Sequence, residues 1–282
     1  MSIVETWTNP RDDSLMRVIT AGPFVMGSTQ EDIASAVRMH KDGGSFALLH
    51  ESPQFEAWTP GFSIGVFAVS NAQFARFLSA IRPSAGQLAS WVQRLERIAV
   101  PAGTRRRYEA TAGFEQHPAV NISWYGAAAY CNWAGLRLPT EIEWERAARG
   151  TDDRVFPWGN DWRPDALRWY EGRSPDETTA PVDAFVEGSS PDGIVQMAGN
   201  VEEWCSDRYQ SSVYARYALA DLSPPRQGHG RVVRGGTCLM RTPIEFRCAM
   251  RRMNSPALVN ILHTGIRCAC DGPGKPTPSS SP

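Results

Sequence analysis

The sequence contains no run of apolar residues long enough to cross a membrane. A bilayer-spanning helix needs about 20 consecutive, mostly apolar residues, and no window of the 282 residues approaches this pattern. The first 30 residues also lack the apolar core of a signal peptide, because charges interrupt them at Glu5, Arg11, Asp12, Asp13 and Arg17. We therefore expect a cytoplasmic protein with no membrane partner.

Charge of one sign, cysteine and histidine are also scarce. The 29 basic and 30 acidic residues leave a net charge of −1, so no overall field attracts nucleic acid. Six cysteines are too few for a disulfide scaffold in a chain of this length. The five histidines show no spacing typical of a metal-binding triad. Composition therefore gives no support for a nucleic-acid partner or a histidine-ligated metal centre.

Two helices joined by a tight turn are predicted at the centre of the chain. Ser123 is an N-cap candidate, and Gly135 lies where a helix ends in a left-handed residue. Thr140 and Glu143 form a capping box, in which each side chain satisfies a backbone N–H of the other residue. The second helix is expected to end at Gly150.

Further elements are predicted before this pair. Ser70 and Gln73 form another capping box, and the apolar residues from Phe74 to Ile81 share one helix face. A further helix is expected within 88–100.

The flanking segments give the domain organisation. Residues 17–27 are typical of a strand hairpin, and the polar residues 29–50 are expected to form a surface insertion. The Pro- and Ser-rich tail 273–282 is expected to be disordered. We predict one domain over residues 1–272.

Motifs along the whole chain resemble the formylglycine-generating enzyme family, also called sulfatase-modifying factors. The motifs that carry this resemblance are Trp133-Ala-Gly-Leu-Arg-Leu-Pro-Thr-Glu-Ile-Glu-Trp144, Met197-Ala-Gly-Asn-Val-Glu-Glu-Trp204, Arg234-Gly-Gly236 and Gly265-Ile-Arg267. The resemblance implies an α+β, C-type-lectin-like fold with short strands, two or three packed helices and much ordered loop. It does not by itself imply the family's chemistry, because function depends on the site.

The resemblance also implies a structural calcium site. Its ligands would be the Gln196 side chain, the carbonyls of Gly199 and Val201, and the Glu203 carboxylate, all of which are oxygen donors of the kind that Ca²⁺ prefers. The alternative is a Gly-Asn turn that Glu203 caps before a strand.

Members of the family that oxidise a peptide cysteine hold Cu(I) with two cysteines, separated by four residues, after the Gly-Gly motif. Counting forward from Gly236, the two positions are Met240 and Glu245. Counting back from Arg247, they are Cys238 and Pro243. Neither alignment supplies the pair of thiolates that this soft metal prefers. The resemblance further implies that Cys131 and Cys268 can pair in a disulfide.

The segment 237–267 combines a polar framework with miscellaneous residues. Arg247, Arg251, Asn254 and Arg267 are expected to be hydrogen-bonded supports for an irregular loop. This pattern resembles the variable proteins of diversity-generating retroelements, which display a rewritten segment on the same kind of fold. The candidate ligand-binding residues are Leu239, Met240, Arg241, Met250, Arg252, Met253, Leu258, Val259, Ile261, Leu262 and His263. The alternative is ordinary divergence of a packed segment.

Three functional classes follow from these patterns. The first is a non-catalytic, monomeric protein that displays a variable recognition surface to an unknown protein or small-molecule ligand. The second is a copper-dependent oxidase that acts on a peptide cysteine. The third is a catalytically silent structural or regulatory paralogue. The missing cysteine pair favours the first class.

Overall fold

A computed structural model describes residues 5–39, 50–95, 97–99, 107–171, 179–257 and 263–272. One four-stranded sheet has the order β1 (Thr6–Thr8), β2 (Leu15–Ile19), β5 (Phe62–Gly65), β12 (Ala269–Asp271). The second has the order β10 (Arg251–Asn254), β9 (Arg231–Arg234), β8 (Glu202–Arg208), β11 (Thr264–Gly265). Two strand pairs complete the sheets, β3 (Gly22–Met26) with β4 (Phe55–Thr59) and β6 (Ile98–Ala99) with β7 (Glu109–Ala110).

The helices are short and pack around these sheets. They are α1 (Gln30–Met39), α2 (Asn71–Ile81), α3 (Ala85–Trp91), α4 (Trp124–Trp133), α5 (Glu141–Arg149) and α6 (Val213–Tyr217), with 3₁₀ turns η2 (Val186–Gly188) and η3 (Pro243–Phe246). The predicted α+β class is confirmed. No helix within the described ranges is long and apolar enough to cross a membrane.

The predicted capping signals are present at both central helices. The Ser123 hydroxyl accepts the Gly126 N–H at 3.0 Å at the start of α4. At the start of α5, Thr140 and Glu143 exchange bonds of 2.8 and 3.2 Å. Gly135 follows α4 with a φ of 73°, the left-handed conformation that favours glycine. The local sequence therefore determined where these helices begin and end.

Helix α2 begins with the predicted capping box of Ser70 and Gln73. The next helix differs from the prediction, because α3 spans 85–91 rather than lying within 88–100. A second capping box, formed by Ser84 and Gln87, starts α3 early.

One prediction for the N-terminal part is wrong. Strands β2 and β3 do not form a hairpin with each other, because β2 pairs with β1 and β5 while β3 pairs with β4. The described part of the insertion forms α1, and most of its residues are exposed or half-buried. Helix α1 buries Ile33 and Ala36 against Ile244 and Met250.

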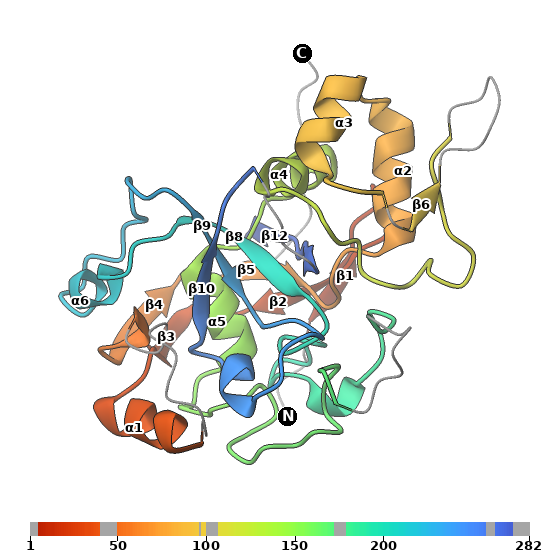
Figure 1. Ribbon diagram of the computed structural model, residues 1–282. Helices are drawn as coiled ribbons and strands as arrows, with labels where there is room; N and C mark the ends of the chain where they lie inside the picture. The colour runs from red at the N-terminus through yellow and green to blue at the C-terminus, as the bar shows by residue number, and fades with distance from the viewer. Residues whose placement is uncertain are drawn as a thin grey trace.

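Helix α5 lies at the centre of the molecule (Figure 1). It contacts β3, β4 and β8, and all nine of its residues are buried. Because five of these residues are charged, the centre of the fold must contain ion pairs as well as apolar contacts.

Candidate functional site

The segment that follows β9 forms the candidate site. The chain leaves the sheet after Arg234, turns through η3, and returns as β10 at the sheet edge (Figure 1). The segment after this strand leads to β11, which pairs in parallel with β8. The site is therefore built on one sheet.

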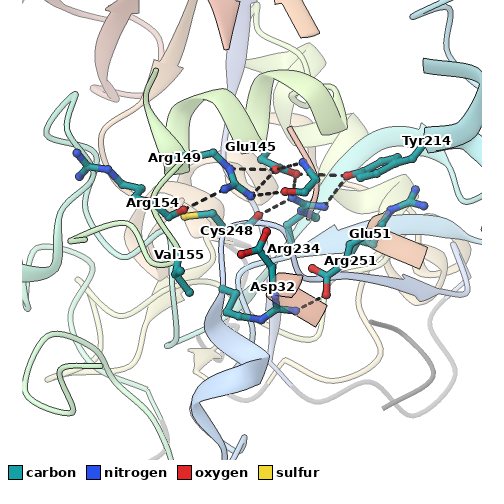
Figure 2. A network of polar contacts seen from close by, with 12 residues as sticks. Asp32, Glu51, Glu145, Arg149, Arg154, Val155, Tyr214, Arg234, Cys248 and Arg251 are labelled. Carbon is teal, nitrogen blue, oxygen red and sulfur yellow. Dashed lines mark hydrogen bonds and ion pairs between the residues drawn. The ribbon is translucent and has the colours of Figure 1, made fainter. Parts of the chain in front are cut away.

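Four buried arginines hold this segment in place, and each pairs with a buried glutamate. Arg251 makes two bonds of 2.7 Å to Glu141. Arg234 bonds to Glu145 at 2.5 Å and to Glu141 at 3.0 Å. Figure 2 shows Arg149, Glu145, Arg234 and Tyr214 in one connected network.

The other two pairs reach more distant parts of the chain. Arg247 pairs with Glu51, and Arg267 pairs with Glu203 at 2.7 Å. The prediction that framework arginines support the loop through hydrogen bonds is therefore confirmed for Arg247, Arg251 and Arg267.

The electrostatics of the network keep its central carboxylate charged. Burial raises the pKa of Glu145, but the charges of Arg234 and Arg149 outweigh it, so the pKa lies below its ordinary value. Burial raises the pKa of Glu51 even though Arg247 opposes this shift. The neighbouring arginines therefore more than compensate the burial of the Glu145 carboxylate, whereas Arg247 compensates the burial of Glu51 only in part.

The positions that correspond to the copper ligands hold other groups. The Met240 sulfur accepts the Thr237 N–H at 3.3 Å. The Glu245 carboxylate caps η3 by accepting the N–H groups of Arg241 and Thr242, and it pairs with Arg252 at 2.7 Å. In the other alignment, Cys238 is fully buried, and the second position is occupied by Pro243, which has no thiol. Neither arrangement brings two thiolates together.

The candidate ligand-binding residues divide into exposed and buried positions. Arg241 and Met253 are exposed, and Leu239, Met240 and Arg252 are half-buried. These five residues lie on or near the surface, as a recognition role requires.

The remaining candidates do not lie on the displayed surface or are not described. Met250 was expected there but is only 3% exposed, because α1 covers it. His263 is also buried, at 7% exposure. Leu258, Val259, Ile261 and Leu262 fall outside the described residues.

The expected calcium ligands are engaged in other contacts. The Gln196 amide nitrogen donates to the carbonyls of Pro181 and Ala184, at 2.9 Å each, and its oxygen accepts from Asn200 at 2.5 Å. The Gly199 carbonyl accepts the Val201 N–H at 2.8 Å.

Glu203 is the only charged member of the expected calcium set. It is 1% exposed, and each of its oxygens accepts two hydrogen bonds, from Arg267 and Trp144. Among the described residues, no three His, Cys, Asp or Glu side chains converge as a metal site. In this arrangement the Gln196 and Glu203 side chains are thus both held by protein groups.

Sequence reasoning missed a polar cluster around Glu202. This residue is only 5% exposed, and burial raises its pKa. Its carboxylate lies 3.3 Å from the Asn254 amide and 3.7 Å from the Arg252 guanidinium. A second acidic residue next to Glu203, directly before the apolar Trp204 and Cys205, was the available signal.

The cysteines are all buried thiols. The sulfurs of Cys131 and Cys268 lie 3.5 Å apart. The structure thus places side by side the two residues that the family resemblance pairs.

Comparison with known proteins gives relatives of two kinds. The formylglycine-generating enzyme of Thermomonospora curvata is 33% identical over 298 residues, which covers 91% of this chain and 93% of that enzyme. The serine/threonine-protein kinase Pkn1 of Chlamydia trachomatis serovar L2 is 37% identical over 227 residues, or 78% of this chain. The chain spans only 35% of the length of that kinase.

Solved structures show the same fold at low identity. PvdO from Pseudomonas aeruginosa superposes with a TM-score of 0.69 at 21% identity, covering 96% of this chain and 99% of PvdO. The Treponema denticola variable protein 1 superposes with a TM-score of 0.64 at 18% identity, covering 96% and 100%. Residues 5–272 match the Sulfatase-modifying factor enzyme 1-like domain. Together with the similarity to the Thermomonospora enzyme, this match shows that the chain belongs to the formylglycine-generating enzyme, or sulfatase-modifying factor, family.

Proposed function

We propose that the protein is a non-catalytic ligand-binding protein built on the formylglycine-generating enzyme scaffold. The observation that carries this proposal is the replacement at the copper positions. Glu245, which stands at one of them, forms an ion pair with Arg252 and caps η3. A carboxylate used in this way cannot substitute for the thiolate that Cu(I) prefers.

The surface beside these positions is suited to recognition. Arg241 stacks over the Tyr170 ring at 3.9 Å from its centroid, and Met253 is 52% exposed. The buried arginine–glutamate pairs hold the loop beneath these side chains in one shape, which reduces the entropy lost on binding. The ligand in this proposal is a protein or small molecule, and the protein acts as a cytoplasmic monomer.

The proposal limits which positions can vary in a retroelement variable protein. Cys238, Ile244, Phe246 and Met250 are buried, so variation there would disturb the core. Variation is expected at the accessible positions, such as Arg241 and Met253. The gene offers a test, since a downstream near-repeat of codons 237–267 that differs at adenines, beside a reverse transcriptase gene, is expected.

The copper-dependent oxidase is the second candidate. The 33% identity with the Thermomonospora enzyme over 91% of this chain favours it. Cys238 is the one thiol left in the segment between Gly236 and Arg247.

A peptide oxidation assay separates these two functions. The purified protein, loaded with Cu(I) under reducing conditions and then exposed to air, is incubated with a Cys-x-Pro-x-Arg peptide. We expect mass spectrometry to detect no formylglycine, because the second thiolate is missing. Conversion that disappears in Cys238→Ala would establish the oxidase instead.

A further inference from the structure

The polar cluster around Glu202 includes Arg252, one of the half-buried candidate recognition residues. Thr264 pairs with Glu202 across β11 and β8, so their side chains share one face of the sheet. Arg252 pairs in register with Val233, which pairs with Trp204. Because Trp204 is two residues from Glu202, all these side chains lie on the same face.

This cluster contains hydrogen-bonding groups that the described part of the protein does not satisfy. The Thr264 hydroxyl is fully buried and has no partner among the described residues. The Nε atom of Arg252 is also buried and has no hydrogen-bond partner among the described residues. It lies 3.7 Å from Glu202, which is too distant for a hydrogen bond. Buried polar groups are normally paired, so unpaired groups in one place need an explanation.

Among the groups of this cluster, the Glu202 carboxylate can accept the most additional hydrogen bonds. An ionised carboxylate can accept about four hydrogen bonds, whereas Glu202 accepts one contact, of 3.3 Å, from Asn254. The guanidinium of Arg252 is instead held by Glu245 at 2.7 Å. A ligand with several N–H donors would complete the coordination of Glu202.

The charge balance decides which donor fits. With both carboxylates ionised, Glu202 and Glu245 supply one more charge than the guanidinium of Arg252 neutralises. A neutral donor would leave that charge buried and uncompensated, which is costly. A cation would neutralise it.

We infer that the cluster of Glu202, Thr264 and Asn254 binds a primary ammonium or guanidinium group of the ligand. Glu202 accepts hydrogen bonds from the cation, and the Thr264 hydroxyl accepts another. Arg252, held by Glu245, forms the wall of the site. This inference rests on the proposed binding function and names the chemical class of the group that the site selects.

Calorimetric titration with small probes tests the inference. The probes are n-propylammonium and methylguanidinium chloride, with acetamide as the neutral donor and sodium acetate as the anion. For ligands of this size we expect a dissociation constant of about 1 mM or weaker for the cations. We expect weaker or undetectable binding of acetamide and acetate.

Variants assign the binding to the cluster. Glu202→Gln should weaken cation binding about tenfold or more, because a charge-assisted hydrogen bond is lost. Thr264→Val, which keeps the shape and removes the hydroxyl, should also weaken it. Arg252→Gln should strengthen it, since a neighbouring positive charge disappears. Glu56→Gln, at an exposed position of β4, is the matched control and should change nothing.

The inference is overturned if neither cation binds saturably, if acetate or acetamide binds as well as the cations, or if Glu202→Gln binds them unchanged. If Glu202→Gln does not fold, the opposite effects of Thr264→Val and Arg252→Gln still decide the question. The peptide oxidation assay is independent of these titrations. Failure of the cation site and failure of the proposed binding function are therefore distinguished.

Discussion

Arg267 binds both oxygens of the Glu203 carboxylate, with N–O distances from 2.7 to 3.0 Å. Both residues are almost fully buried, at 0% and 1% exposure. The remaining guanidinium hydrogens reach the carbonyls of Gly65, Val66 and Val195. This ion pair therefore ties β8 to the end of β5 and to the residues before the Gly-Asn turn.

The first prediction concerns the role of this pair. Glu203→Gln should destabilise the fold by about 3 to 5 kcal/mol, because it leaves the Arg267 charge buried without its partner. Urea unfolding of the wild type should give the same midpoint with calcium and with a chelator. If calcium raises the wild-type midpoint and Glu203→Gln abolishes this rise, Glu203 is a calcium ligand.

The second prediction uses two methionines in the same segment. Met250 is 3% exposed and packs against α1, so Met250→Ala should cost about 2 to 5 kcal/mol. Met253 is 52% exposed, and Met253→Ala should cost only about 0.5 kcal/mol. Urea unfolding of the two variants measures both costs. Equal costs would contradict the division of this segment into core and recognition surface.

The third prediction concerns pH. Burial, with the charge of Glu141 as a second cause, raises the pKa of Asp207 to about 6. Between the ordinary pKa of an aspartate, about 4, and this raised value, the folded state binds a proton that the unfolded state has released. The contribution of Asp207 to stability is therefore present at low pH and is lost as pH rises from about 4 to 6.

The comparison with Asp207→Asn isolates this contribution. The difference in unfolding free energy between wild type and variant should fall by roughly 1.4 kcal/mol per pH unit within the window and then level off. Urea unfolding at a series of pH values measures it. A difference that does not change with pH would mean that Asp207 is ionised throughout.

Local signals explain which parts of the fold the sequence predicts well. A capping box involves residues three positions apart, so Ser70 and Thr140 locate the starts of α2 and α5 without knowledge of the rest of the chain. Strand pairing is not local in this way. The partner of β3 is β4, which lies beyond α1 in the sequence, and the pattern around residues 17–27 cannot reveal it.

The candidate site shows the same limit. The absence of the copper pair and the supporting role of the framework arginines were predicted, because they depend on residue type and motif spacing. Burial of Met250 was not predicted, since it depends on α1, which comes from a distant part of the chain. The Glu202 cluster also combines three strands whose alignment no local pattern specifies.

The last prediction concerns Cys131 and Cys268, whose sulfurs lie 3.5 Å apart in the core. A thiol oxidant such as diamide should join them in a disulfide, because a small side-chain movement brings the sulfurs to bonding distance. Intact-protein mass spectrometry should show the loss of two hydrogens, and peptide mapping should place the bond between these residues. The hydrogen bond with Cys131 and burial raise the pKa of Cys268 too, and burial raises the pKa of Cys205 and Cys248. The closeness of the two sulfurs, rather than easy ionisation, therefore selects Cys131 and Cys268 for oxidation.

The cross-link should also raise stability. The two cysteines are 137 positions apart, and closing so long a loop in the unfolded chain should stabilise the fold by up to roughly 5 kcal/mol. Cys131→Ser is the control, and oxidant should leave its urea midpoint unchanged. If oxidised wild type shows no bond between these cysteines, or a bond that lowers the midpoint, the two thiols are only packed neighbours.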